Sequence, residues 1–173
     1  MIELYDRYNQ ESQDLHESLV ATGLSQLGVV IDADGFLPDG LVSPFTYYLG
    51  YEKGKPLYFN QVPVPAFWEI SGNNQSARIE DMTQERAVIH YADGMQARLV
   101  KQVDWKDLEG RVRQVDHYNR FGACFATTTY SADSEPIMTV YQDVNSQQVL
   151  LENHVTGDIF LTLPGQSLSL IHI

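Results

Sequence analysis

The sequence predicts an α+β protein in which a small N-terminal α/β segment precedes an extended antiparallel β-sheet, built as a meander of hairpins. Between residues 66 and 163, nine β-rich runs of five to nine residues alternate with turn clusters that contain Gly, Asn, Asp, Ser or Pro. Connections this short join only antiparallel neighbours, because a parallel return needs a crossover of a dozen or more residues. The region before residue 66 has instead a helical pattern followed by one apolar strand.

The N-terminal segment begins with a predicted amphipathic helix. Leu15 and Leu19 lie four residues apart, Ser12 can cap the start of the helix, and Gly23 ends the pattern. The run LGVVI at 27–31 is continuous rather than alternating, which is typical of a strand covered on both faces. A turn-rich loop and one short helical turn at 43–48 are expected to follow.

The predicted boundary lies in the proline-rich stretch 53–65, which suits an extended connector rather than a central strand. We therefore divide the chain into an α/β segment at 1–52 and a β-sheet domain at 53–167. Residues 168–173 read LSLIHI, which is what a common transposase adapter used in sequencing libraries encodes. These last six residues are predicted to be a non-native tail.

Composition limits the classes of function. A net charge of −12, from 23 acidic and 11 basic residues, argues against unaided binding of nucleic acid or of an anionic membrane. The single cysteine, Cys124, excludes an internal disulfide and a zinc site made of several thiolates. No leader peptide and no apolar stretch of membrane-spanning length is expected from the pattern.

No catalytic residue, metal site or cofactor is predicted from the motifs. Asp32 and Asp34 follow an apolar strand and could hold a divalent metal on a sugar nucleotide, but an exposed acidic turn explains them more simply. Three histidines at 90, 117 and 154 lie on or beside separate strands without the spacing of a metal site. Cys124 in a β-rich run is typical of a small buried apolar residue.

Five aromatic residues are the candidates for a surface that binds a partner or an acceptor, because Trp and Tyr anchor interfaces and stack on sugars. They are Trp68, Trp105, Tyr118, Tyr130 and Tyr141. The alternative is that they fill the packed face of the sheet. In the run LVKQVDW, strict alternation would place Val100 opposite to Val103 and Trp105, so we expect strands that are half-covered on both faces.

The chain resembles a known family along nearly its whole length. The matching segments are QESQDLHESL, DADGFLPDGLVSPFTYY, KPLYFNQVPVPAFWEISG, LVKQVDW, VDHYNRFG and ENHVTGDI. Together they are similar to the N-terminal part of GtfB, the stabilising subunit of the glycosyltransferase of the accessory Sec system.

This resemblance implies a bacterial, cytoplasmic subunit, at most peripheral at the inner face of the cell membrane. It implies a catalytic partner subunit of GT-B fold and a Ser/Thr-rich acceptor polypeptide, with transfer of N-acetylglucosamine to serine-rich repeat adhesins before export. The subunit itself would be non-catalytic, and residues 1–52 would form part of a Rossmann-like half of a GT-B fold. Two rival hypotheses remain: a glycosyltransferase that uses Asp32 and Asp34, and a stand-alone β-domain that binds carbohydrate or protein.

Overall fold

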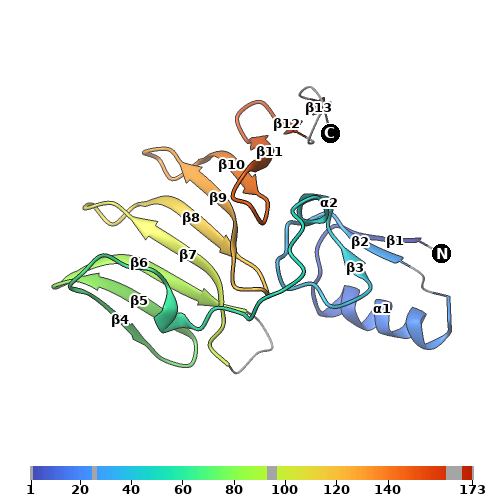
Figure 1. Ribbon diagram of the computed structural model, residues 1–173, viewed down its shortest axis with the longest axis horizontal. Coiled ribbons are helices and arrows are strands. Elements are labelled where there is room, and N and C mark those ends of the chain that lie inside the picture. The colour runs from blue at the N-terminus through green and yellow to red at the C-terminus, as the bar shows by residue number, and fades with distance from the viewer. Residues whose placement is uncertain (1, 25–26, 93–96, 163–168, 173) are drawn as a thin grey trace.

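The computed structural model describes residues 2–24, 27–92, 97–162 and 169–172. A three-stranded parallel sheet with one long helix stands beside a ten-stranded antiparallel sheet, which confirms the predicted fold class (Figure 1). The elements in the N-terminal half are β1 (Ile2–Tyr5), α1 (Gln10–Ala21), β2 (Leu27–Val30), β3 (Leu41–Val42), α2 (Pro44–Tyr47) and the 3-10 helix η1 (Phe59–Gln61). The large sheet consists of β4 (Trp68–Gly72), β5 (Ser76–Asp81), β6 (Gln84–Tyr91), β7 (Val100–Lys106), β8 (Val112–Tyr118), β9 (Cys124–Tyr130), β10 (Pro136–Gln142), β11 (Gln148–Asn153), β12 (Asp158–Leu161) and β13 (Ser169–His172).

Helix α1 forms where it was predicted, but it buries a different face. Asn9 caps it, since the Asn9 side chain accepts a hydrogen bond from the Ser12 N–H and the Ser12 hydroxyl accepts one from the Asn9 N–H. Ser12 and His16 are buried, whereas Leu15 is 52% exposed. The reason is a polar contact beneath the helix: His16 Nδ1 lies 2.7 Å from a carboxylate oxygen of Glu3. The prediction of a Leu15–Leu19 apolar face was wrong.

The small sheet has the order β1-β2-β3, and its first strand was not predicted. Ile2 pairs with Leu27 and Leu4 with Val29, so their side chains share one face of the sheet. On that face Ile2 is 72% exposed and Leu4 67% exposed. The expectation that the strand at 27–31 is covered on both faces is therefore wrong for the residues that the structure describes.

The large sheet is a pure meander in which every strand pairs with its neighbours in sequence, as predicted. A β-bulge corrects one detail of strand β7. His90 pairs with Gln102 but Tyr91 pairs with Val100, so Lys101 is an extra residue. The bulge turns Val100 to the same side as Val103, and both are fully buried in one apolar cluster. Strict alternation had predicted opposite faces.

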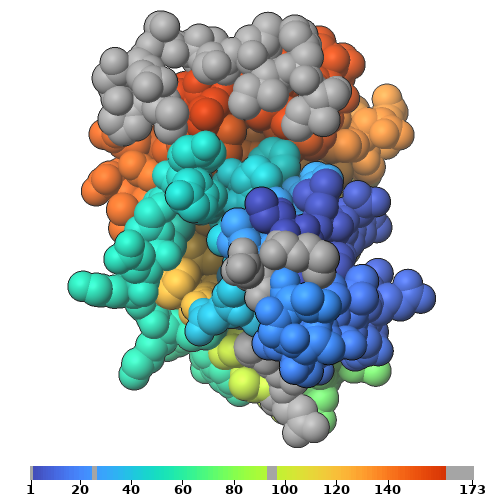
Figure 2. All heavy atoms as spheres, turned by 90° about the vertical axis from the view of Figure 1, so that its right-hand side faces the viewer, coloured from blue at the N-terminus to red at the C-terminus, as the bar shows by residue number. Residues whose placement is uncertain are grey.

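Two apolar clusters lie on opposite faces of this twisted sheet. The connector that carries η1 covers β4–β8 on one face, where Val62 packs on Ile79 and Ile89. Around helix α2, Leu49 packs on Tyr141 and other residues of β9–β12 on the other face. Figure 2 shows the N-terminal segment in blue and the last strands in orange and red on the same side of the molecule, and the segment after β3, in cyan, lies between them.

The chain passes from one face of the large sheet to the other where the connector crosses the β8–β9 turn. Here Gly54 and Gly122 both have positive φ, and a Cβ atom on either would lie within 2.3 Å of a backbone oxygen of the opposite segment. Glycine is required at this crossing for close approach as well as for φ.

The predicted domain boundary between residues 52 and 53 stays a prediction. Residue 167, the predicted last native residue, lies outside the described residues.

Candidate functional site

A cavity of about 290 Å³ lies between the loop after β2 and one face of the large sheet. Asp32 and Ala33 line it from the loop, while strands β8–β11 and the residues that follow β11 line it from the sheet. A second cavity of about 360 Å³ shares Asp32, Ala33, Tyr141 and Glu152 with the first. The two together form one groove between the N-terminal segment and the sheet, which we call the sheet groove.

A file of polar side chains crosses the strands along the floor of the sheet groove. His117 Nε2 lies 3.0 Å from the Thr128 hydroxyl, and the Thr128 and Thr139 hydroxyls are 2.8 Å apart. The file ends at His154, whose Nε2 lies 2.7 Å from the Thr139 hydroxyl. Strand pairing builds this file, because Thr128 and Thr139 are directly opposite on β9 and β10.

The file constrains the protons of its two histidines. Its three contacts need three protons, and each threonine hydroxyl supplies one. The third must come from Nε2 of His117 or His154, so at least one of the two imidazoles donates into the file and they cannot both accept from it. Burial lowers the pKa of His117 and so favours its neutral form, although nearby Asp104, Asp116 and Asp32 oppose this.

Carboxylates give the sheet groove an acidic rim. Glu152 accepts a hydrogen bond from the Tyr141 hydroxyl at 3.2 Å, and its other oxygen lies 3.7 Å from Nδ1 of His154. Burial and the Glu152 carboxylate raise the pKa of Tyr141, so its phenol is a permanent donor. Arg7 also lines the second cavity, but the carboxylates of Asp6, Asp32 and Glu152 outnumber it, so the net charge disfavours phosphate. The hydroxyls, imidazoles and carboxylates suit a neutral ligand rich in hydroxyls and amides.

The five predicted aromatic residues do not form one surface. Trp68, Trp105 and Tyr118 belong to the apolar cluster under the connector, with Tyr118 buried. Tyr130 and Tyr141 line the sheet groove on the opposite face. Contact with a partner or an acceptor stays a prediction for all five, and the geometry favours the last two for a ligand in the sheet groove.

The two tryptophans are held by polar contacts as well as by packing. The Trp105 indole donates a hydrogen bond to Asp116 at 2.7 Å. The Arg86 guanidinium lies 5.2 Å from the centre of the Trp68 ring. Asp116 therefore faces away from its neighbour His117, as expected for consecutive residues of a strand.

The aspartates that could have held a metal are used differently. Asp34 forms an ion pair with Lys101 at 3.1 Å and accepts a hydrogen bond from the Phe36 N–H, whereas Asp32 lines the sheet groove. Among the described residues no group of three or more His, Cys, Asp or Glu side chains is placed to hold a metal ion. His90 pairs with Asp104 at 2.9 Å, and this hydrogen bond raises the pKa of His90.

Cys124 is not an activated nucleophile. Burial raises the pKa of its thiol to about 11, and the Asp116 carboxylate contributes in the same direction. The thiol instead contacts the Ala126 carbonyl and the Thr127 hydroxyl within the sheet. This agrees with the structural role predicted for it.

The central residues of the sheet groove were missed by sequence reasoning. Thr128, Thr139 and Glu152 carry no motif, and threonine is common in any strand. The signal that could have revealed them is the register: hairpin pairing aligns Thr128 with Thr139 and Thr139 with Glu152. That signal requires knowing the bulges in advance.

Two family models match the chain. The model of the GtfB N-terminal domain matches residues 2–48, and that of the GtfB middle domain matches residues 68–170. The chain is 91% identical over 168 residues to the UDP-N-acetylglucosamine–peptide N-acetylglucosaminyltransferase stabilizing protein GtfB of Streptococcus pneumoniae, and 55% identical over 170 residues to that of Streptococcus gordonii. These alignments cover 97% of this chain, which spans 38% of the length of either relative.

Solved structures show the same fold. A chain of a GtfA/B complex bound to UDP and GlcNAc, 53% identical in sequence, superposes with a TM-score of 0.94 over 99% of this chain and 39% of its own length. A structure of the pneumococcal O-GlcNAc transferase GtfA, 12% identical, superposes with a TM-score of 0.63 over 92% of this chain and 38% of its own length. The second likeness concerns the fold alone.

Proposed function

Because this chain belongs to the GtfB family, we propose that it is a non-catalytic stabilising and acceptor-holding part of a protein O-GlcNAc transferase complex. The partners proposed are a catalytic glycosyltransferase subunit and a Ser/Thr-rich acceptor polypeptide, the serine-rich repeat region of an adhesin before its export. Similarity to proteins named as stabilizing proteins and to a chain from a GtfA/B complex supports a hetero-oligomeric role.

The observation that carries acceptor binding is the sheet groove. Its floor presents the hydroxyls of Thr128 and Thr139 between two imidazoles, and its rim presents the carboxylates of Asp32 and Glu152. Such groups exchange hydrogen bonds with the hydroxyls and amides of a Ser/Thr-rich chain. The acidic rim also disfavours a sugar nucleotide, whose diphosphate is negatively charged.

The rival proposal of a metal-dependent transferase receives no support from these residues. Asp34 is paired with Lys101, so a metal at this carboxylate would have to displace an ammonium group first.

For residues 1–52 we propose a place in a Rossmann-like half of a GT-B fold. The parallel arrangement of β1, β2 and β3, with α1 as the crossover between the first two, supports this. The exposed face of the small sheet with Ile2 and Leu4, which a further layer would cover, also supports it.

We also propose a cytoplasmic location, at most peripheral to the membrane, as the resemblance implies. Within the described part of the chain, no helix has both the length and the apolarity needed to cross a bilayer.

The experiment uses a hybrid protein in which this chain replaces the matching segment of the Streptococcus pneumoniae relative. The hybrid is co-expressed with a catalytic glycosyltransferase subunit, and transfer of N-acetylglucosamine to a Ser/Thr-rich repeat peptide is measured. We expect the hybrid to co-purify with the catalytic subunit and to raise glycosylation above that of the catalytic subunit alone. Absence of both effects would refute the proposed function.

A further inference from the structure

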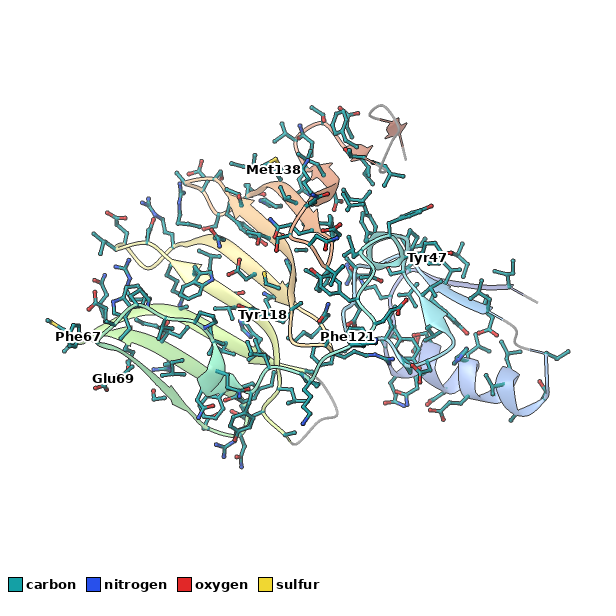
Figure 3. All side chains as sticks on the ribbon, in the orientation of Figure 1. Tyr47, Phe67, Glu69, Tyr118, Phe121 and Met138 are labelled. Atoms are coloured by element: carbon teal, nitrogen blue, oxygen red, sulfur yellow. The ribbon has the colours of Figure 1, made fainter. Side chains whose placement is uncertain are left out.

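Two large apolar side chains stand almost fully in solvent at the free end of the sheet, far from the N-terminal segment. Phe67 is 96% exposed and Met82 is 93% exposed. Phe67 directly precedes β4, and Met82 lies in the loop between β5 and β6, so both are next to the Trp68–Asp81 pair. Figure 3 shows Phe67 at this end, with Glu69 close to it.

The backbone holds both side chains outward at a conformational cost. The Trp68 N–H donates a hydrogen bond to the Pro65 carbonyl, and Phe67 occupies the third position of this turn with φ of 72°. Met82 has φ of 57° at the first position of a two-residue hairpin loop. Glycine or asparagine is usual at both kinds of position, and a bulky residue there is an outlier. Neither side chain belongs to the apolar clusters of the described residues, so their packing does not explain the strained backbone.

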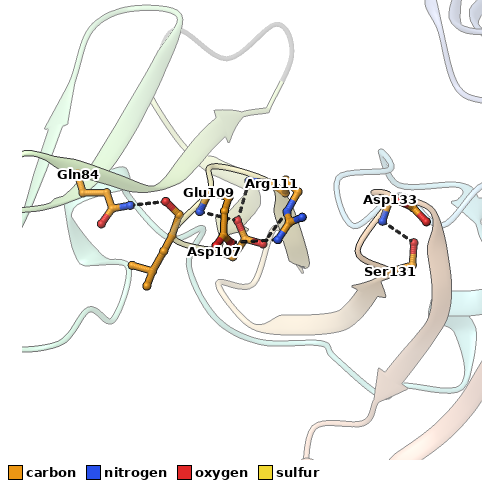
Figure 4. A network of polar contacts seen from close by, with 7 residues as sticks. Gln84, Asp107, Glu109, Arg111, Ser131 and Asp133 are labelled. Carbon is orange, nitrogen blue, oxygen red and sulfur yellow. Dashed lines mark hydrogen bonds and ion pairs between the residues drawn. The ribbon is translucent and has the colours of Figure 1, made fainter.

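A third exposed apolar residue extends this surface. Leu108, at the tip of the β7–β8 hairpin, is 68% exposed. Its carbonyl accepts a hydrogen bond from the Gln84 side chain, two residues after Met82 (Figure 4). We call Phe67, Met82 and Leu108 the tip surface.

The charges beside the tip surface indicate the chemistry of its partner. Glu69 is directly opposite Glu80, and Glu80 is opposite Glu85, so three carboxylates form a row across β4, β5 and β6. Lys106 and Arg78 form ion pairs with Glu85 only. Among the described residues, Glu69 and Glu80 have no cationic partner within ion-pair distance. Like charges directly opposite in a sheet are destabilising, and basic side chains of a bound protein would relieve this.

We propose that the tip surface binds the catalytic glycosyltransferase subunit, in an apolar socket bordered by Lys or Arg side chains. This inference rests on the proposed function and adds the surface through which it operates. A second copy of this chain would bring Glu69 and Glu80 against the same residues across a two-fold axis, which charge disfavours. An anionic membrane is disfavoured for the same reason.

The test measures the affinity of the hybrid protein for the catalytic subunit by analytical ultracentrifugation. The variant Phe67→Gly, Met82→Gly removes both side chains and relieves the backbone, so it should fold at least as well as the parent. We expect it to weaken the complex by about tenfold or more, as for central anchor residues. Glu69→Lys with Glu80→Lys should also weaken it, whereas Glu69→Gln with Glu80→Gln should reduce its salt dependence.

The matched control is Val155→Ser, which removes an apolar side chain that is 74% exposed on another turn, between β11 and β12. It should leave affinity unchanged. If the parent hybrid binds and the Phe67→Gly, Met82→Gly variant binds equally well, the inference is overturned and the proposed function stands. If the parent hybrid does not bind the catalytic subunit, both the inference and the proposed function are refuted. If the variant abolishes only self-association of the hybrid, a second copy is the occupant and the inference is overturned.

Discussion

Thr128 and Thr139 face each other across β9 and β10 with their hydroxyl oxygens 2.8 Å apart, and both residues are buried. This contact joins two histidines whose positions in the sequence are 37 residues apart (154 − 117) into one hydrogen-bonded file. Because each hydroxyl has one proton and the file has three contacts, at least one of the two imidazoles must donate into it. Loss of the Thr128 hydroxyl removes the partner that His117 Nε2 has in the file, whereas loss of the Thr139 hydroxyl leaves Thr128 in contact with His117 alone.

Replacement of Thr139 by valine keeps the shape of the side chain and removes the hydroxyl. The Thr128 hydroxyl then keeps only His117 as a partner, and the exposed His154 loses its contact with the file, so we expect a loss of about 0.5–1.5 kcal/mol in the free energy of unfolding. Urea unfolding measures it. The matched control is Thr129→Val, at an exposed position on the same strand as Thr128, and equal stability of the two variants would contradict the account.

His117 makes stability depend on pH in a defined direction. Burial lowers its pKa in the folded chain below the value of about 6.5 for an unfolded chain. As the pH falls through 6.5 towards the folded pKa, the unfolded state takes up a proton that the folded state resists, so stability decreases. We expect His117→Gln to lose less stability than the parent between pH 7 and pH 5.

His90 acts in the opposite direction, since its pKa is raised by Asp104. Its contribution is fully present below a pH of about 6.5 and is lost as the pH rises through the folded pKa. This contribution is common to the parent and the His117→Gln variant, so it cancels in the comparison of their unfolding curves. Parallel pH profiles for the two proteins would show that His117 is not the group responsible.

Gly122→Ala tests the docking of the connector on the β8–β9 turn. A Cβ atom at residue 122 would lie 2.3 Å from the Lys55 carbonyl oxygen, so one of the two segments must move. Gly110 has a similar φ of 80° and no atom within 4 Å of the position of a Cβ. Gly110→Ala should therefore cost about 1 kcal/mol from backbone strain alone, and Gly122→Ala clearly more, in thermal or urea unfolding.

Cys124 should react slowly with thiol reagents. With a pKa of about 11, the thiolate fraction at pH 8 is about one in a thousand. Alkylation by iodoacetamide at pH 8 should be much slower for the folded chain than for the chain in concentrated urea. A folded-state rate equal to the unfolded one would contradict the burial of this thiol.

The strands of the large sheet could be predicted because turn residues bound each of them. The N-terminal helix was found for a similar reason, since Gly23 marks its end with φ of 71°. Its buried face could not be found, because the His16–Glu3 contact depends on a strand at Ile2–Tyr5 that has no turn before it. A buried polar pair under a helix does not show in an apolar pattern.

The face of the sheet on which each side chain lies, and so which residues line the sheet groove, could not be predicted for a different reason. One extra residue reverses the face of every side chain beyond it, and Lys101 is such a residue. Val100 was therefore assigned to the wrong face. Further register shifts in the β8–β9 and β9–β10 pairs prevented the faces of Tyr130 and Tyr141 from being predicted. Bulges depend on the packing of neighbouring strands, which a single sequence does not specify.

The most direct test of the central claim is the affinity of a fluorescently labelled Ser/Thr-rich repeat peptide for the complex of the hybrid protein with the catalytic subunit. We predict that Glu152→Gln and Thr139→Val, both in the sheet groove, weaken binding by about tenfold, while Thr129→Val on the other face leaves it unchanged. Equal affinities for all of these proteins, with the complex intact, would contradict the assignment of the sheet groove as the acceptor site.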